Sequence, residues 1–232
     1  MKGGLNMIYN VFDRKKKTTP ISDAEVGSSV YCKVDGVRTE FLIVQKGNPD
    51  TSIYDSSCDG IWLLAKSLSD KSIYYDRNYT YEARIDLWKY LNNTLRPKLD
   101  VGSIIKEAKV PCYNGNNQNA TTQILSPIFP LSVTEMGVQN QYGATEGKKL
   151  DYFVYEYTDE AQSNAKRIAY VSGTSDADTY WTRTDNYRYN YQYCIAINGS
   201  LVNRDANTSQ YVRPCFIIPS DTKIDASGNI LV

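Results

Sequence analysis

The chain has 232 residues, enough to bury a large hydrophobic core without help from disulfides or metals. Its 26 basic and 26 acidic residues balance, which argues against a nucleic-acid-binding protein and against charge-driven binding to anionic membranes. The chain contains no histidine, the commonest general base and transition-metal ligand, but it has 20 tyrosines, which provide flat amphipathic contact surface.

Residues 1–20 are predicted to form a polar N-terminal arm, and a single domain is expected over residues 21–232. The arm carries one basic run at residues 14–17, which is typical of a solvated segment. It lacks the apolar core of a secretory signal, and no stretch of the chain is apolar over the length of a membrane helix. We therefore expect cytoplasmic synthesis without signal-directed export, and no membrane insertion.

The first elements of the domain are predicted to be strands. Residues 28–34 and 37–45 have strand character, and the Asp35-Gly36 pair between them is a strong signal for a two-residue hairpin turn. The apolar run at residues 60–65 predicts a buried strand.

One main helix is predicted at residues 81–96, where apolar side chains recur at helical spacing: Ile85, Trp88, Leu91, Leu95 and Leu99. Pro97 is expected to end it. Shorter helical pieces are expected at residues 101–109 and 160–167. Further strands are expected at residues 152–157, 194–198 and 212–218.

The five cysteines are an odd number and include no C-x-x-C pair: Cys32, Cys58, Cys112, Cys194 and Cys215. This pattern favours buried free thiols in a reduced compartment, although one disulfide stays an alternative.

Three spaced motifs distinguish the C-terminal third of the chain. They are Tyr-Trp-Thr-Arg-Thr at residues 180–184, a predicted strand that leads into Asn198-Gly199, and Val-Arg-Pro-Cys-Phe at residues 212–216. With the Leu-Trp-Lys-Tyr-Leu-Asn helix at residues 87–92, they resemble a bacterial and phage domain family of the C-type-lectin type. That family is related in fold to formylglycine-generating enzymes.

The resemblance implies an α+β, C-type-lectin-like fold with mixed short strands, one main helix and long C-terminal loops. Some members of this fold are variable proteins of diversity-generating retroelements, in which errors at template adenines diversify a region equivalent to residues 180–218. The implied function is ligand or receptor binding, as in a phage tail protein, and the implied location is a virion tail or a cell surface. The expected partner is a protein or glycan receptor, with no nucleic acid, and a homo-oligomer stays open.

Residue usage in the window 182–212 agrees with such diversification. Mutation of adenines in AAC codons does not produce Lys, Glu, Gln, Met or Trp. The window contains no Lys, Glu, Met or Trp, although these types make up 30 of the 232 residues. It does contain Gln192 and Gln210, which must be fixed by the template or come from other codons. An ordinary polar loop is the alternative interpretation.

Residues 185–193 alternate tyrosine with polar side chains, so an extended segment places four tyrosines on one face. Tyrosine with adaptable polar neighbours is typical of antibody contact surfaces. The predicted contact residues are Asp185, Asn186, Tyr187, Arg188, Tyr189, Asn190, Tyr191, Tyr193, Asn203, Arg204, Asp205, Asn207 and Ser209. The alternative is a tyrosine ladder packed on the domain. Arg183 and Arg213, inside the motifs, are expected to be structural.

Two other function classes compete with binding. One is a structural or decoration subunit of a virion or cell surface. The other is an enzyme of the formylglycine-generating type, which needs a reactive cysteine; Cys194 and Cys215 lie in or beside predicted strands without a nearby Lys. We expect no catalysis and no cofactor. The loosely spaced Asp176, Asp178 and Asp185 do not predict a metal site.

Overall fold

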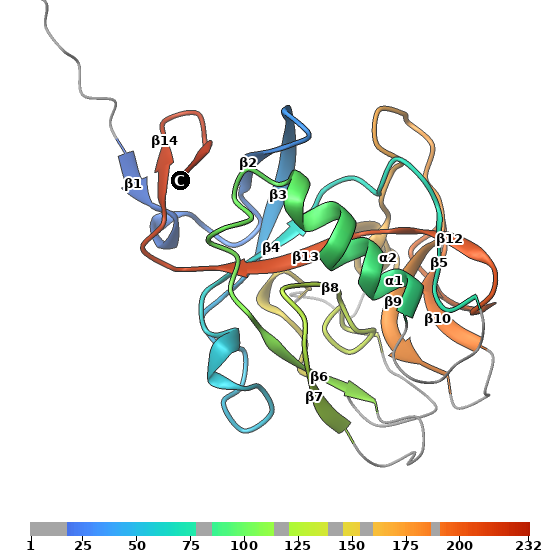
Figure 1. Ribbon diagram of the computed structural model, residues 1–232. Helices are drawn as coiled ribbons and strands as arrows, with labels where there is room; N and C mark the ends of the chain where they lie inside the picture. The colour runs from blue at the N-terminus through green and yellow to red at the C-terminus, as the bar shows by residue number, and fades with distance from the viewer. Residues whose placement is uncertain (1–17, 78–84, 114–120, 139–145, 154–159, 187–190) are drawn as a thin grey trace, which may run out of the picture.

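The computed structural model describes residues 18–77, 85–113, 121–138, 146–153, 160–186 and 191–232. Within these residues most of the regular structure is β-sheet, with two short α-helices, which agrees with the predicted α+β class. Two five-stranded sheets form the bulk of it, beside a three-stranded sheet and a two-stranded hairpin (Figure 1). In this part of the chain no helix is both long and apolar enough to cross a membrane.

The first five-stranded sheet, called here the central sheet, contains the predicted N-terminal hairpin. Its strands follow the order β2 (Ser29–Val34), β3 (Val37–Lys46), β4 (Ile61–Ala65), β13 (Pro214–Ile218) and β8 (Ile128–Pro130). All neighbouring strands in it are antiparallel. Asp35 and Gly36 form the predicted turn, with φ angles of 52° and 81° that glycine adopts freely and aspartate tolerates.

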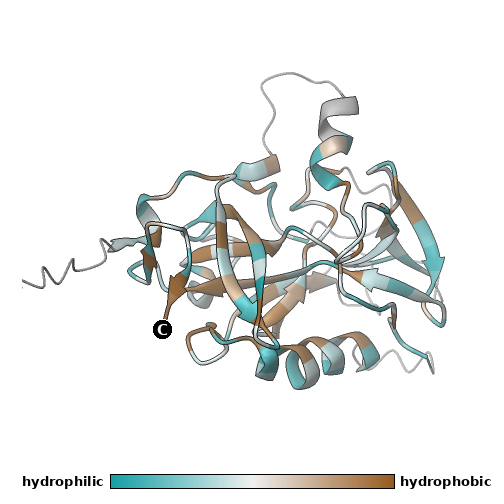
Figure 2. Cartoon of the chain, turned by 90° about the horizontal axis from the view of Figure 1, so that it is seen from above, coloured by the Kyte–Doolittle hydropathy of each residue, from teal (hydrophilic) through white to brown (hydrophobic). Residues whose placement is uncertain are grey.

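Both faces of the inner strands β4 and β13 of the central sheet are buried, and their successive side chains alternate between two hydrophobic clusters. On β4, Leu63 belongs to one cluster and Trp62 to the other; on β13, Phe216 and Ile217 divide in the same way. A strand that is covered on both faces needs an unbroken apolar sequence. This explains why the strands read Ile-Trp-Leu-Leu-Ala and Pro-Cys-Phe-Ile-Ile, and Figure 2 shows these central strands mostly in brown.

The second five-stranded sheet, called here the outer sheet, holds most of the C-terminal motifs. Its order is β11 (Leu201–Asp205), β10 (Tyr191–Ile195), β9 (Tyr180–Asp185), β12 (Ser209–Val212) and β5 (Ile73–Tyr74). The β12–β9 pair is parallel, and the other pairs are antiparallel. Only Arg213 separates β12 from β13, so one extended segment passes from the outer sheet into the central sheet (Figure 1).

The main helix packs against the cluster that contains Leu63. Its described part runs as α1 (Ile85–Lys89), a π-helical segment (Tyr90–Leu95) and a 3-10 turn (Arg96–Lys98); residues 81–84 lie outside the described residues. The helical path continues through Pro97, because this residue lies in the first turn of the 3-10 segment, where its missing N–H costs little. Asn92 fixes the helix to β8 by exchanging hydrogen bonds of 3.1 Å and 3.0 Å with the backbone of Ile128.

The shorter predicted elements have mixed outcomes. α2 (Glu160–Arg167) confirms the helical segment predicted there. The helix predicted over residues 101–109 is wrong: residues 101–104 form turns, and β6 (Lys109–Tyr113) follows and pairs with β7 (Thr121–Leu125). The Lys106 amide donates to the Ile217 carbonyl at 2.8 Å, so a contact with the distant strand β13 holds this segment out of a helix.

The strand predicted over residues 152–157 is absent from residues 152–153, the part of this range that the structure describes. Residues 151–153 form a 3-10 turn, η5 (Asp151–Phe153), and residues 154–157 lie outside the described residues. Two further 3-10 turns precede β2 and β4 in the chain: η1 (Ile21–Asp23) and η2 (Ser56–Cys58).

The two ends of the domain lie side by side. β1 (Thr18–Pro20) pairs with β14 (Lys223–Asp225), which also pairs with β15 (Ile230–Leu231). Residues 18–20 therefore belong to a sheet and not to the N-terminal arm, and residues 1–17 of that arm lie outside the described residues.

Candidate functional site

The hairpin β10–β11 brings together the two polar stretches of the C-terminal region. Tyr191 pairs with Asp205, Gln192 with Arg204, and Tyr193 with Asn203. The short turn at Asn198-Gly199 joins the two strands and brings the two stretches side by side.

The turn of this hairpin rests on Gly199. Its φ of 79° favours glycine, and a Cβ atom there would lie 2.1 Å from the carbonyl oxygen of Asn164 in α2. The Arg167 side chain donates to the Gly199 carbonyl at 2.8 Å, and the Asn198 side chain accepts a 3.1 Å bond from the amide of Ser200. The Asn-Gly motif thus docks the hairpin onto α2.

The predicted contact residues divide by exposure. Five are exposed and lie on the hairpin or on the turn that leads into β12: Tyr191, Asn203, Arg204, Asn207 and Ser209. Asp185 and Asp205 are half-buried. Tyr187, Arg188, Tyr189 and Asn190 lie outside the described residues. These five exposed residues are therefore the described part of the predicted contact surface.

Two predicted contact residues, Tyr193 and Asn186, are buried, and the expectation that they face a partner is wrong. Tyr193 is 4 % exposed against 43 % for Tyr191, so the two do not form a continuous exposed row. The alternation rule says only which face a side chain lies on and not how far that face is covered; in addition, the register of β10 with β9 shifts between Gln192 and Cys194. Asn186 instead donates to the Asn203 side chain at 2.8 Å and ties the ends of the two stretches together.

Asp205 stabilises the turn that follows β11, next to the exposed residues. Its carboxylate accepts a 3.1 Å hydrogen bond from the amide of Asn207, and its carbonyl accepts one of 2.9 Å from the amide of Thr208. This is the local turn chemistry typical of aspartate. The turn holds Asn207 outward, beside the exposed end of the hairpin.

Beneath this surface lies a fully buried ion pair between Arg183 on β9 and Glu135. Arg183 makes a bidentate contact with the carboxylate and donates to the carbonyls of Pro111 and Pro130 at 2.9 Å and 3.2 Å. Burial alone would lower the pKa of Arg183, but Glu135 raises it above its usual value. The Tyr54 hydroxyl also donates to Glu135, at 2.8 Å.

Arg183 is thus structural, as predicted, whereas Glu135 and the Tyr54 hydroxyl that donates to it were not predicted from the sequence. Glu135 had one usable signal, because it is a single acidic residue that follows a long apolar run. A carboxylate in such a place is rarely buried without a cation. Tyr54 gave no comparable signal, since tyrosine is common in many environments.

Trp181 and Arg213, two other residues of the motifs, also belong to the buried framework of the domain. Trp181 is fully buried, donates to the Ile73 carbonyl at 2.7 Å and packs edge-on against Tyr75. Arg213 is buried and donates to the Ala65 carbonyl at 2.9 Å. The prediction that Arg213 is structural is confirmed, and its contacts lock the passage from β12 into β13.

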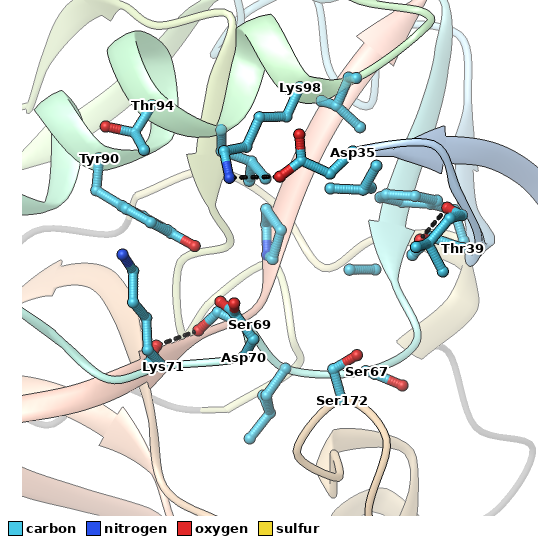
Figure 3. Close-up of a pocket in the computed structure, with 18 of the residues that line it drawn as sticks. Asp35, Thr39, Ser67, Ser69, Asp70, Lys71, Tyr90, Thr94, Lys98 and Ser172 are labelled. Carbon is cyan, nitrogen blue, oxygen red and sulfur yellow. Dashed lines mark hydrogen bonds and ion pairs between the residues drawn. The ribbon is translucent and has the colours of Figure 1, made fainter.

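A cavity of about 310 Å³ opens on a different part of the molecule (Figure 3). It lies between the β2–β3 hairpin, residues 67–71 after β4, and helical residues 90–99. None of the predicted contact residues lines it. The sequence analysis did not predict this cavity, because its walls come from segments far apart in the chain.

The sequence matches a protein family over the segment that carries the outer sheet and strands β4, β8 and β13 of the central sheet. The family is described as Domain of unknown function (DUF6273), and its sequence model covers residues 59–220. The chain belongs to this family. No significant match was found among curated proteins or among solved structures. The DUF6273 segment begins just before β4 and ends just after β13, so it includes the buried ion pair and the β10–β11 hairpin.

The Cys194 and Cys215 thiols of the DUF6273 segment are buried in surroundings that disfavour the thiolate. All five cysteines of the chain are free and buried, as predicted. Burial raises the pKa of the Cys194 and Cys215 thiols well above the usual value, and Glu135 adds to the effect at Cys215. Because the thiolate is the reactive form, these thiols are held in their unreactive state. Over the described ranges, no three Cys, Asp or Glu side chains converge on a metal-sized site.

Proposed function

We propose that this DUF6273 protein is a non-enzymatic binding module with a C-type-lectin-like fold. Its contact surface is the exposed end of the β10–β11 hairpin and the turn into β12. The partner is a protein or glycan receptor, and the placement by resemblance is a virion tail or a cell surface.

The observation that carries this proposal is the contrast in burial between strands β9 and β11 of the outer sheet. In β9, Thr182, Arg183 and Thr184 are buried and hydrogen-bonded to the core. Two strands further out, on β11, Arg204 and Asn203 are exposed. A rigid framework that ends in exposed, loosely constrained side chains is the arrangement in which contact residues change without loss of the fold.

The composition of the exposed set also supports recognition. Tyrosine supplies large contact area with few rotors, arginine is favoured at binding hot spots, and asparagine and serine supply adaptable hydrogen bonds. Tyr191, Arg204 and Asn207 present these three chemistries on neighbouring segments. Such a surface suits a polar receptor rather than a lipid phase.

We further propose that this surface is diversified by a retroelement. Gln192, a type that adenine mutation of AAC codons does not produce, is buried at 8 % exposure. Gln210 pairs with Ile73 of β5 and is half-buried. Both glutamines therefore occupy framework positions, where a template is expected to keep the residue constant. The exposed positions, in contrast, are of types that such mutation does produce.

The gene sequence provides the first test. Codons that end in C at Tyr191, Asn203, Arg204 and Asn207, opposite AAC codons in a near-identical template repeat beside a reverse transcriptase gene, are the expected result. Unremarkable codons with no template repeat would overturn the diversification proposal and leave the binding proposal to the next experiment.

The second test measures binding directly. The purified chain is applied to a glycan array and to an array of intact bacterial cells, together with the Tyr191→Ala and Arg204→Ala variants. Tyr170→Ala is the matched control, because Tyr170 is similarly exposed but lies away from the hairpin. We expect a subset of targets to be bound, with loss in the two hairpin variants alone. Equal binding by all variants would place the contact surface elsewhere.

A further inference from the structure

The cavity beside the β2–β3 hairpin is built as a small-molecule site. At about 310 Å³ it lies at the lower end of the volumes typical of ligand pockets. Its lining comes from the β2–β3 hairpin, residues 65–71, helical residues 90–99, the start of β13 and Ser172. Pockets of this kind combine an apolar body with a few placed polar groups, and both are present here.

The floor of the cavity is apolar and rigid. Phe41, Ala65, Leu99 and Phe216 line it and also belong to the buried core. Phe41 and Phe216 pack edge-to-face with ring centroids 5.1 Å apart, which fixes both rings. Because these side chains are held by the core behind them, the floor is preformed and does not need to reorganise around a ligand.

The rim carries charges of both signs. Asp35 and Lys98 form an exposed ion pair of 2.6 Å, and Asp70 and Lys71 lie on the opposite wall. Figure 3 shows Lys98 and Asp35 on one side of the opening, with Ser69, Asp70 and Lys71 across from them. Two acidic and two basic groups around one opening give no preference for a net charge, but they suit a ligand that carries one charge of each sign.

The charge of the Asp70 carboxylate affects the pKa of two other groups that line this opening. Burial first, and then the Asp70 carboxylate, raise the pKa of Tyr90 to about 12. Asp35 first, and to a smaller extent Asp70, raise the pKa of Lys98. Figure 3 shows Asp70 and the tip of the Tyr90 side chain at this opening, with Lys98 on the other side of it.

We propose that this cavity binds a small amphipathic zwitterion of the α-amino-acid class, with an apolar side chain on the floor formed by Phe41, Leu99 and Phe216. Asp70 and the Tyr90 hydroxyl receive the ligand's ammonium group. Lys98 receives its carboxylate. The ligand carboxylate takes the place of Asp35 in the ion pair, and this exchange is inexpensive because an exposed ion pair contributes little to stability.

This site is independent of the proposed receptor-binding surface. It shares none of the predicted contact residues, and it lies on the helix side of the central sheet instead of on the β10–β11 hairpin. Failure of receptor binding therefore leaves the small-molecule site intact, and the two proposals are tested with different variants.

Binding is measured by titration calorimetry and NMR on the full chain with leucine and phenylalanine as probes. Isoamylamine lacks the carboxylate of leucine, N-acetyl-leucine lacks its ammonium charge, and glucose and N-acetylglucosamine represent neutral polyols. We expect saturable binding of at least one amino acid, with each leucine analogue weaker by roughly tenfold or more, the loss typical of a charged hydrogen bond. Failure of both amino acids to bind, equal binding of the analogues, or preference for the sugars would overturn the proposal.

Two substitutions distinguish a ligand-binding role of Lys98 from a purely structural role. Both break the Asp35–Lys98 ion pair, but only one of them removes Lys98. Lys98→Gln removes the group that holds the ligand carboxylate and is expected to weaken binding by roughly tenfold or more. Asp35→Asn frees Lys98 while keeping a residue that tolerates the positive φ of the turn, so binding is expected to stay equal or become tighter. An equal loss in both variants would show that the pair merely supports the fold, and the proposal would fail. Asp221→Asn, exposed elsewhere, is the control.

Discussion

Arg183 and Glu135 are joined by a bidentate ion pair in which neither side chain has any exposed surface. The two residues are 48 positions apart in the sequence. A buried pair of this kind gains little over a well-packed apolar contact, but an unpaired charge at the same depth is very unfavourable. The pair therefore makes β9 and the segment around Glu135 strongly dependent on each other.

We predict that Glu135→Gln and Arg183→Met each lower the free energy of unfolding by about 3–5 kcal/mol, because each leaves one buried charge without its partner. Urea unfolding followed by circular dichroism measures the change. The double variant is expected to lose clearly less than the sum of the single losses. Strictly additive losses would contradict the interpretation of a mutually dependent pair. Lys66→Ala, which breaks an exposed pair with Glu40, is the control and is expected to cost less than about 1 kcal/mol.

Glu40 gives a pH-dependent prediction. Burial acts to raise its pKa, but hydrogen bonds from Lys66 and Ser29 lower the pKa below the usual value. Because the folded pKa is the lower one, the carboxylate stabilises the fold above the unfolded value of about 4.3, and this contribution is lost as pH falls through the lowered pKa.

Glu40→Gln is therefore expected to be less stable than the natural chain at pH 7, by no more than about 1 kcal/mol, since the pair is partly exposed. The difference should shrink steadily below pH 4. Urea unfolding at several pH values between 3 and 7 provides the measurement. A difference that stays constant over this range, or grows toward acid pH, would disprove the assigned role of Glu40.

Gly199 and Gly173 form a matched pair for testing the docking of the hairpin. Both have a φ of 79°, but a Cβ atom at Gly199 meets the Asn164 carbonyl at 2.1 Å, whereas a Cβ atom at Gly173 meets nothing within 4 Å. Gly173→Ala is expected to cost about 1–2 kcal/mol of stability through backbone strain alone. Gly199→Ala is expected to cost clearly more, because α2 must also move. Equal losses in thermal melting would mean that the hairpin does not pack on α2.

The Tyr191→Ala and Trp181→Ala variants distinguish a residue of the exposed surface from a residue of the buried core. Tyr191→Ala is expected to change the stability by no more than about 0.5 kcal/mol, since the side chain is exposed at the edge of the hairpin. Trp181→Ala should cost about 3–5 kcal/mol, because it removes a fully buried ring that packs on Tyr75. Thermal melting of both variants gives the comparison. If Tyr191→Ala unfolds the chain, the residue belongs to the core and the proposed contact surface fails.

Elements governed by local chemistry were predictable from the sequence. The Asp35-Gly36 turn follows from the backbone preferences of two adjacent residues, and the buried strand β4 follows from an unbroken apolar run. The predicted helix at residues 101–109 failed because its fate depends on a hydrogen bond to Ile217, more than a hundred residues away. Local propensity contains no information about such a contact.

The same distinction explains the outcome at the candidate site. The pairing of the two polar stretches was predictable, because a short turn joins them. The burial of Tyr193 was not, because alternation assigns faces only relative to a sheet whose neighbours and register are known. The cavity beside Lys98 and the partner of Arg183 likewise depend on segments that meet only in the folded chain.

The order of strands in the central sheet has a consequence for synthesis of the protein. β13 lies between β4 and β8 but follows both of them in the chain. While the ribosome is still making residues 130–213, the apolar edges of β4 and β8 have no strand between them. The nascent chain therefore cannot complete its central sheet until residues 214–218 have emerged from the exit tunnel, and until then the unpaired edges of β4 and β8 are sites at which aggregation can start.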